Sequence, residues 1–350
     1  MEDYKDINRI LELMPQPVFC VRDGIILCRN HAAGQLYLEP GLPVAELLGD
    51  ALQDYLDFQG SSLYVQLKLP GMLLGAGVTR MDGMDVFVTT QDQSELQTMA
   101  LAALQFREPL TEIMLILNRD GESMETGSRG QLQRRLFQMQ RLVQNMSDAM
   151  RYTTQISDRQ TCEDICSVVE EMLQRISVLT EQSGFQLVYS CPQEQILTML
   201  NKEKLERALY NMISNAMKVT PKGGTIEAKL TCVNRRLRLS VRDYGAGIPQ
   251  EIAGNLFTRY LRQPGLDSGQ EGLGLGMTMI RSMAVEHGGA VLIDHPDNIG
   301  TRVTVTMSIR NHSEAVFRSQ VKGLDYGGER DHGLIELSAF LPPEIYTTEI

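Results

Sequence analysis

Apolar positions give the first 90 residues the pattern of short strands separated by turns. Runs rich in β-branched and aromatic residues flank two Asp-Gly pairs, at residues 23–24 and 82–83. Asp-Gly between two apolar runs predicts a β-hairpin. The order of two strands, short helices and three further strands predicts a small α/β domain over residues 1–90.

Residues 91–156 have a helical period instead. Two apolar series, separated by a polar stretch containing glycine, each alternate gaps of three and four residues. This heptad spacing predicts an antiparallel helical hairpin packed through its a and d positions. One hairpin cannot bury its own seam, so we expect a homodimer with a four-helix bundle. The two series are Leu96, Met99, Ala103, Phe106, Leu110, Ile113 and Leu117, then Leu132, Leu136, Met139, Val143, Met146 and Met150.

Residues 157–310 alternate helical and strand patterns. Successive antiparallel strands with helices between them predict a layer of helices on a sheet. The whole chain is therefore expected to be an α+β multidomain protein. Residues 311–350 form a tail with one short amphipathic piece, to which the sequence assigns no role.

Composition narrows the classes of partner. Lys and Arg number 33 against 44 Asp and Glu, a net charge of −11. Nucleic acids and anionic membranes need a basic face, so neither is expected as a partner. No apolar run approaches the ~20 residues of a membrane helix, and the acidic start lacks a signal-peptide pattern. We therefore expect a cytoplasmic location. The six scattered cysteines favour reduced, mostly buried thiols over a metal site.

A first candidate for chemistry lies on the helical pattern around residue 211. Asn211 and Asn215 are one turn apart, and Lys218 follows on the same face. An amide oxygen can complete the shell of a Mg²⁺ ion that keeps waters and phosphate oxygens, and a lysine offsets phosphate charge. The alternative is that these side chains only contact solvent.

A second candidate is Asp243 at a strand end, followed by Gly245 and Gly247. The glycines permit positive φ and close approach to a ligand. The carboxylate can accept a hydrogen bond from an exocyclic amine such as that of adenine. The alternative is an ordinary Asp-Gly turn.

Glycines at 272, 274 and 276 directly precede a helical pattern, where bare amides can bind an anion. The segment lacks the Gly-Lys-Ser/Thr of a P-loop and the preceding parallel strand of a dinucleotide fold. Upstream, Phe257 and Tyr260 could anchor a mobile lid, although core packing is the default interpretation of such aromatics.

Taken in order, these segments make residues 185–310 resemble the ATP-binding domain of sensor histidine kinases, which gyrase, Hsp90 and MutL share. They match its N, G1, F and G2 boxes, and Gly300-Thr301 matches its closing element. The pattern of residues 1–90 resembles a PAS-type sensor domain. Gln270 stands where the family often has glycine, which implies an altered lid and weaker nucleotide binding.

The resemblance implies ATP and Mg²⁺ as cofactors. It makes Asn215 the Mg²⁺ ligand with Asn211 as its helper, and Lys218 a phosphate contact. The implied ATP-binding residues are Asn211, Asn215, Lys218, Asp243, Gly245, Gly247, Phe257, Gly272, Leu273, Gly274 and Thr301.

The family's phosphoacceptor motif has a histidine, then an acid, ahead of Arg-x-Pro-Leu. Here Arg107, Pro109 and Leu110 align, which puts Leu104 at the histidine and Gln105 at the acid. Leucine carries no nucleophile and glutamine cannot act as a general base. The five histidines all lie outside residues 91–156. Usual autophosphorylation should therefore fail, and Thr111 is a poor substitute acceptor.

Three functions remain open. The first is a kinase relative that binds Mg-ATP as a pseudokinase or regulatory partner, the second a conventional histidine kinase acting on a response regulator, and the third a non-catalytic dimeric module. A gyrase-like ATPase is less favoured, because the nearest acid, Glu206, lies more than two turns before Asn215.

Overall fold

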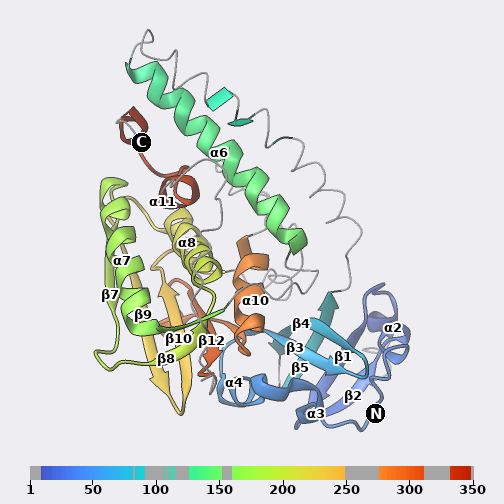
Figure 1. Cartoon of the computed structure of the whole chain (residues 1–350). Helices are drawn as coiled ribbons and strands as arrows, with labels where there is room; N and C mark the ends of the chain where they lie inside the picture. The colour runs from blue at the N-terminus through green and yellow to red at the C-terminus, as the bar shows by residue number, and fades with distance from the viewer. Residues whose placement is uncertain are drawn as a thin grey trace.

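The chain folds into mixed α/β structure built on one long sheet with helices layered against part of it (Figure 1). No helix in the described part of the chain has the length and apolarity needed to cross a membrane. The computed structural model describes residues 9–81, 83–90, 106, 110–111, 113–114, 126–151, 160–248, 276–310 and 332–347.

Residues 9–90, which we call the N-terminal domain, follow the expected order of elements. The first hairpin turns at Asp23 and Gly24, both with positive φ (52° and 76°), as a tight two-residue turn requires. Four short helical segments then precede three strands. The elements are β1 (Val18–Arg22), β2 (Ile25–Arg29), α2 (His31–Gly34), α3 (Ala45–Leu48), η1 (Gly49–Ala51), α4 (Leu52–Asp57), β3 (Ser62–Leu69), β4 (Met72–Met81) and β5 (Met84–Thr90).

Residues 160–310, which we call the α/β domain, hold the other strands and three longer helices. Most of its strands are antiparallel, but β7 and β9 pair in parallel, which the sequence did not predict. The elements are β6 (Thr161–Asp164), α7 (Ile165–Gln182), β7 (Gln186–Ser190), β8 (Leu197–Leu200), α8 (Lys202–Val219), β9 (Thr225–Val233), β10 (Arg236–Arg242), α10 (Gly276–Glu286), β11 (Val291–Asp294), η3 (Pro296–Asn298) and β12 (Arg302–Ser308).

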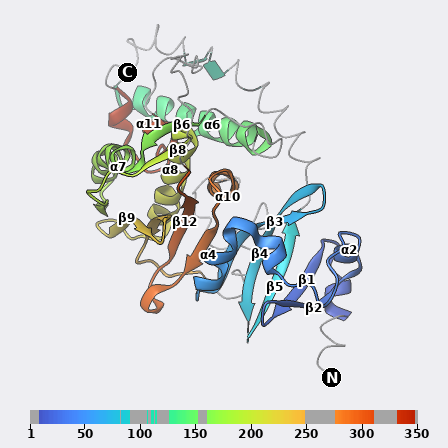
Figure 2. The ribbon, with the colours of Figure 1, turned by 60° about the horizontal axis from the view of Figure 1, so that its bottom comes forward.

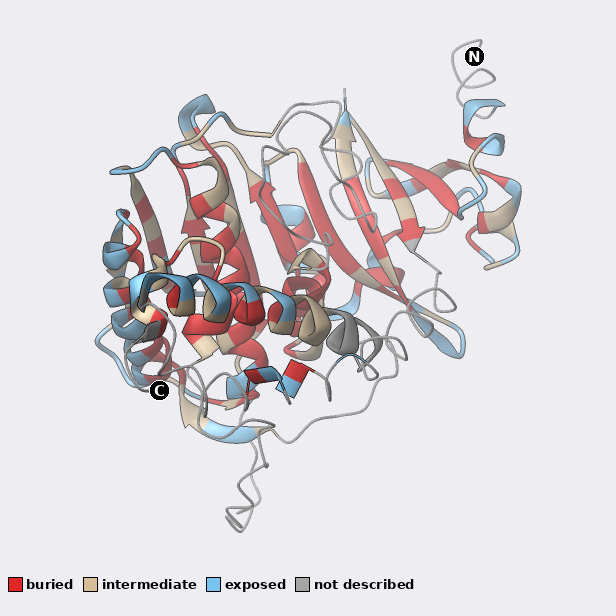
Figure 3. Ribbon diagram, turned by 90° about the horizontal axis from the view of Figure 1, so that it is seen from above, coloured by how far each residue is buried: buried red, intermediate tan, exposed pale blue. Residues whose placement is uncertain are grey.

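The two domains share one sheet. Its ten strands run in the order β2-β1-β5-β4-β3-β11-β12-β10-β9-β7. The junction is an antiparallel pairing of β3 with β11, in which Leu63 lies opposite Leu292 and Tyr64 opposite Val291. Each domain nevertheless has an apolar core, visible as buried strands and inner helix faces in Figure 3. The two cores exchange residues at the junction, where Tyr64 packs in the core of the α/β domain and Leu292 in that of the N-terminal domain.

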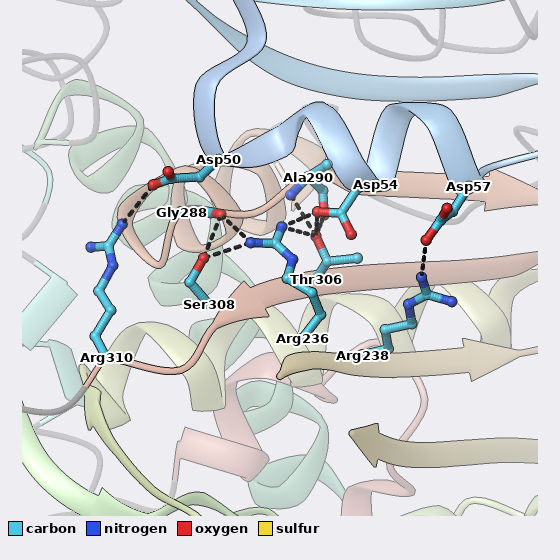
Figure 4. A network of polar contacts seen from close by, with 10 residues as sticks. All are labelled: Asp50, Asp54, Asp57, Arg236, Arg238, Gly288, Ala290, Thr306, Ser308 and Arg310. Atoms are coloured by element: carbon cyan, nitrogen blue, oxygen red, sulfur yellow. Dashed lines mark hydrogen bonds and ion pairs between the residues drawn. The ribbon is translucent and has the colours of Figure 1, made fainter. Parts of the chain in front are cut away.

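A polar network crosses the same junction (Figure 4). The fully buried Asp54 side chain of α4 pairs with Arg236 of β10 and accepts a hydrogen bond from Thr306 Oγ1 at 2.7 Å. One ion pair that is more exposed to solvent lies on each side of it: Asp50 with Arg310 at 3.8 Å, and Asp57 with Arg238 at 3.6 Å. The spacing of the aspartates aligns all three along one face of η1 and α4.

A long helix, α6 (Thr126–Arg151), lies across the helical layer of the α/β domain, with the C-terminal segment beside it (Figure 2). The C-terminal segment is residues 332–347, with α11 (His332–Glu336) and η4 (Pro343–Thr347). Of the apolar series predicted on α6, Leu136 is buried here, while Leu132 and Met139 are exposed. Part of the expected bundle seam therefore packs within the chain.

The C-terminal segment is fastened by apolar packing and by one buried ionic group. The Tyr346 ring packs against the Phe137 ring of α6 at a tilt of 46°, with ring centres 5.0 Å apart, and its hydroxyl donates to Leu334 O at 2.8 Å. Glu336 lies between two arginines, at 3.0 Å from Arg141 Nε and 3.7 Å from Arg207 Nε. The amphipathic piece without an assigned role thus joins α6 to α8.

Candidate nucleotide site

Helix α8 carries one end of the candidate site. Asn201 caps its first turn, since its side chain accepts a hydrogen bond from Lys204 N at 3.1 Å. Strong helix formers and an apolar stripe then continue the helix for 18 residues. Its last turns carry Asn215 and Lys218, both half-buried, so these two groups face a partly enclosed space.

Asn215 and Lys218 are close together. Lys218 Nζ donates to Asn215 Oδ1 at 3.5 Å, a long hydrogen bond. Burial lowers the pKa of Lys218 to about 8, and the nearby Arg141 guanidinium adds to this effect. Burial removes water from the Lys218 ammonium and so disfavours its charged form. A phosphate group bound there would stabilise the charged form again, so the site is suited to phosphate.

Asn211 is not open in the same way. It is almost fully buried, and its Nδ2 donates to Arg207 O at 2.8 Å and to Met279 Sδ at 3.4 Å. A side chain at Gly276, where α10 begins, would come within 2.7 Å of Asn211 Oδ1. In this conformation Asn211 therefore fixes the start of α10 against α8, and it has no exposed oxygen to offer a metal ion.

Asp243 follows β10 and is buried. Its Oδ1 accepts hydrogen bonds from the backbone amides of Gly245 at 2.9 Å and Thr301 at 3.1 Å. Among the described residues, no donor reaches its Oδ2. Burial raises the pKa of the Asp243 carboxyl, and the two amides oppose part of that rise. One oxygen thus orients the carboxylate, and the other remains an acceptor.

The turn after Asp243 needs glycine for reasons of space. A side chain at Gly245 would lie 2.5 Å from Val219 O, at the end of α8. Gly247 has φ of +75°, and a side chain at Gly300 would meet Asp243 O at 2.0 Å. These close approaches bring the Asp243 turn, Thr301 and the end of α8 together.

Other predicted residues lie outside the described part of the chain. These are Phe257, Gly272, Leu273 and Gly274, along with Leu104 and Gln105 at the acceptor position. Their places in the site stay predictions.

Sequence reasoning missed Arg141 of α6. Its Nη2 donates to Ser214 Oγ at 2.9 Å, and Ser214 directly precedes Asn215. Arg141 thereby adds a second positive charge next to Lys218. No local pattern indicated this, because the contact joins residues 73 positions apart.

The described residues fit a nucleotide better than a metal cluster. They contain no group of three or more His, Cys, Asp or Glu side chains that could hold an ion. Asn215 Oδ1 could supply one neutral oxygen to a Mg²⁺ ion that also keeps water and phosphate ligands. Lys218 supplies positive charge for a polyphosphate, while the nearby Arg141 is already paired with Glu336, and Asp243 supplies a buried acceptor for a base amine.

Comparison with known proteins finds a family match over the part of the chain that holds these residues. Residues 200–311 match the family described as "Histidine kinase-, DNA gyrase B-, and HSP90-like ATPase". The adaptive-response sensory kinase SasA of Crocosphaera subtropica is 26% identical over 226 residues, which cover 61% of this chain and 59% of that protein. The sensor histidine kinase Hik2 of Thermosynechococcus vestitus is 32% identical over 133 residues, 38% of this chain and 34% of Hik2.

A full-length structure of ShkA in complex with AMPPNP aligns with 62% of this chain and 46% of that one, at 19% identity and a TM-score of 0.48. The chain spans 59% or less of the lengths of SasA and Hik2. The chain is thus similar to sensor histidine kinases, and residues 200–311 match the ATPase family named for them.

Proposed function

We propose that this protein binds Mg-ATP in the α/β domain but does not pass phosphate to a histidine of its own helices. It acts as a regulatory partner that signals through its conformation or by pairing with an active kinase. The observation that carries the proposal is Leu104 at the acceptor position, in a segment that contains no histidine. If the protein binds nucleotide but has no histidine to accept the phosphoryl group, nucleotide binding itself is the step that can transmit a signal.

In the proposed complex, Asp243 accepts a hydrogen bond from the adenine amine, and Gly245 and Gly247 border the base. Lys218 pairs with the phosphates, and Asn215 completes the coordination of Mg²⁺. This assignment is supported by the pairing of Lys218 with Asn215 and by the orientation of the Asp243 carboxylate by two amides. Gly272, Leu273 and Gly274 would hold the phosphates, with Phe257 in the lid.

Signalling by conformation is supported by the short path from the N-terminal domain to this site. Strand β11, which pairs with β3, leads directly to His295. The His295 ring donates from Nδ1 to Gly300 O at 2.8 Å, next to Thr301. In addition, Arg281 of α10 lies 4.7 Å from the ring centre of Tyr64 on β3. A PAS-like N-terminal domain could thus act on two elements, β11 and α10, that lead to the proposed nucleotide site.

We propose further that the protein is a homodimer through residues 91–156, with an active kinase or a response regulator as a second partner. The exposed Leu132 and Met139, one heptad apart on α6, offer an apolar stripe for the second copy.

Titration with ATP, with and without Mg²⁺, tests the nucleotide site. Asp243→Asn should weaken binding at least tenfold, because a hydrogen bond to a charged group contributes about 1.5–3 kcal/mol. Asp297→Asn is the matched control, since that carboxylate is 80% exposed on the same domain. Asn215→Ala should remove most of the Mg²⁺ dependence. Absence of binding at millimolar ATP would favour a non-catalytic module.

Incubation with γ-labelled ATP tests the acceptor. We expect no label on the natural chain, and an acid-labile, base-stable label on a Leu104→His, Gln105→Glu variant. Label of that kind on the natural chain would show a conventional histidine kinase instead. If the variant binds ATP yet stays unlabelled, the defect extends beyond the acceptor.

A further inference from the structure

Two cysteines lie directly opposite each other in the first hairpin. Cys20 of β1 and Cys28 of β2 are paired in the antiparallel ladder, and the register shifts immediately after them. Opposed residues of antiparallel strands have Cα atoms about 4.5 or 5.5 Å apart. Both values lie inside the range of about 4.4–6.8 Å that a disulfide spans. The backbone therefore already has the spacing that a bond between these thiols requires.

The pair lies in a small apolar cluster of its own. Cys20 is fully buried and Cys28 is 5% exposed, and Leu11 and Val18 complete the cluster. The Asn30 side chain, two residues after Cys28, donates to Leu11 O and to Met14 O, at 3.3 and 3.0 Å. The segment over the cysteines is thus held in place, and the pair is accessible only to small molecules.

The two thiols are chemically different. Cys20 donates a hydrogen bond to Cys28, which lowers the pKa of Cys28 to about 7, while the pKa of Cys20 is raised. Cys166 shows what burial does without such a donor, since burial raises the pKa of its thiol. Thiolate is the reactive form of cysteine, so Cys28 is equipped as a nucleophile and Cys20 as its neighbour.

We propose that Cys20 and Cys28 are a redox site, which a hydroperoxide converts reversibly from a dithiol to a disulfide. The Cys28 thiolate attacks the terminal oxygen of ROOH and breaks the O–O bond, leaving ROH and a sulfenic acid. The Cys20 sulfur then attacks the Cys28 sulfur, the S–S bond forms and water leaves. In sum, two thiols and ROOH give one disulfide, ROH and H₂O, with two electrons passing to the peroxide.

This site would make the N-terminal domain responsive to hydroperoxides. The S–S bond would tie β1 covalently to β2 at the point where their register shifts, beside Asn30 and the segment that Asn30 holds. A change there bears on the N-terminal domain whether or not the α/β domain binds nucleotide, so the inference is independent of the proposed function.

The test is hydrogen peroxide treatment of the full chain, followed by blocking of free thiols and trypsin digestion. Arg22 separates the two cysteines, so a disulfide must join peptides 10–22 and 23–29. We expect this joined pair to form, and to disappear on reduction with dithiothreitol. A parallel sample is treated with oxidised glutathione instead of peroxide. It should leave the two peptides separate, because oxidised glutathione is too large to reach a buried thiol.

Cys162 and Cys232, both exposed, are the internal controls. Iodoacetamide should label them in the folded protein and leave Cys20 and Cys28 unlabelled. A Cys20→Ser variant should stop at Cys28 sulfenic acid, which dimedone detects when it is added together with a denaturant that opens the site; the peptide mapping needs no variant. Peroxide that oxidises Cys162 and Cys232 while peptides 10–22 and 23–29 stay separate would overturn the proposal, as would joining that dithiothreitol does not reverse.

Discussion

The N-terminal domain and the C-terminal segment contact the α/β domain through different chemistry. Beside the β3–β11 pairing, the junction with the N-terminal domain has the buried ion pair of Asp54 and Arg236, with more exposed ion pairs on both sides. The C-terminal segment instead makes its contact through buried apolar side chains such as Leu337 and Leu341, with Glu336 as its ionic group. We therefore expect the polar part of the first contact to depend mainly on one ion pair, and the second contact to depend on many residues.

The largest effect should come from Arg236→Ala. It leaves the Asp54 carboxylate buried without its ionic partner, and breaking a buried pair costs about 3–5 kcal/mol. Urea unfolding measures the loss. Arg238→Ala is the matched control, because that pair is 31% and 40% exposed and should contribute less than about 1 kcal/mol. Similar losses for the two variants would remove the distinction between the central and the outer pairs.

A smaller effect is expected on the other side. Leu341 is fully buried in the C-terminal segment. Leu341→Ala should destabilise the protein by about 2–3 kcal/mol, at the low end for such changes because a terminal segment can adjust around the gap. Leu132→Ala, at an exposed position of α6, should change stability by less than about 0.5 kcal/mol. Limited proteolysis near residue 331 would report release of the segment. A loss larger than that of Arg236→Ala would reverse the comparison.

The pKa of Lys218, which lies close to Arg141 of α6, predicts how stability and ATP affinity depend on pH. Its folded pKa of about 8 lies below the value of 10.5 for an ordinary lysine. Between these values the unfolded chain binds more protons, so stability without nucleotide should rise with pH. ATP affinity should fall over the same range, by up to about tenfold, as the ammonium is lost. Calorimetry measures both.

Lys218→Arg keeps its charge and should abolish this pH dependence while retaining ATP binding. Affinity that is constant from pH 7 to 10 in the natural chain would separate Lys218 from the phosphate site.

The smallest effect is predicted for Asp50→Asn. The pair of Asp50 with Arg310 has its side chains 59% and 43% exposed. Its removal should cost less than about 1 kcal/mol and nothing measurable in high salt. Thermal unfolding at two salt concentrations is sufficient. A salt-independent loss would mean that this pair is as well shielded as Asp54 and Arg236.

Local chemistry carried most of what could be predicted. The Asp23-Gly24 turn and the α8 helix follow from short-range rules, and so does the Asp243 turn. The pairing of β3 with β11 could not be predicted, because nothing in the sequence of either strand indicates which strand it pairs with. The same holds for Glu336, whose two arginines come from α6 and α8.

Asn211 shows a different limit. Its helical spacing correctly placed it one turn before Asn215, but spacing could not indicate that α10 would bury it. Contact with Met279 decides whether its amide faces a ligand or the protein interior. Such a contact depends on how two helices pack against each other. Neither the helical period of the sequence nor its composition determines that packing.

The pairing of β3 with β11 also determines how the α/β domain would behave in isolation. Without residues 9–90, β11 would present a row of unpaired amides and carbonyls on a rim that is covered in the intact chain. Exposed rims of this kind recruit further strands from other molecules. A fragment that begins at residue 160 is thus expected to self-associate at high concentration, and a lysine at Leu292 should keep it monomeric.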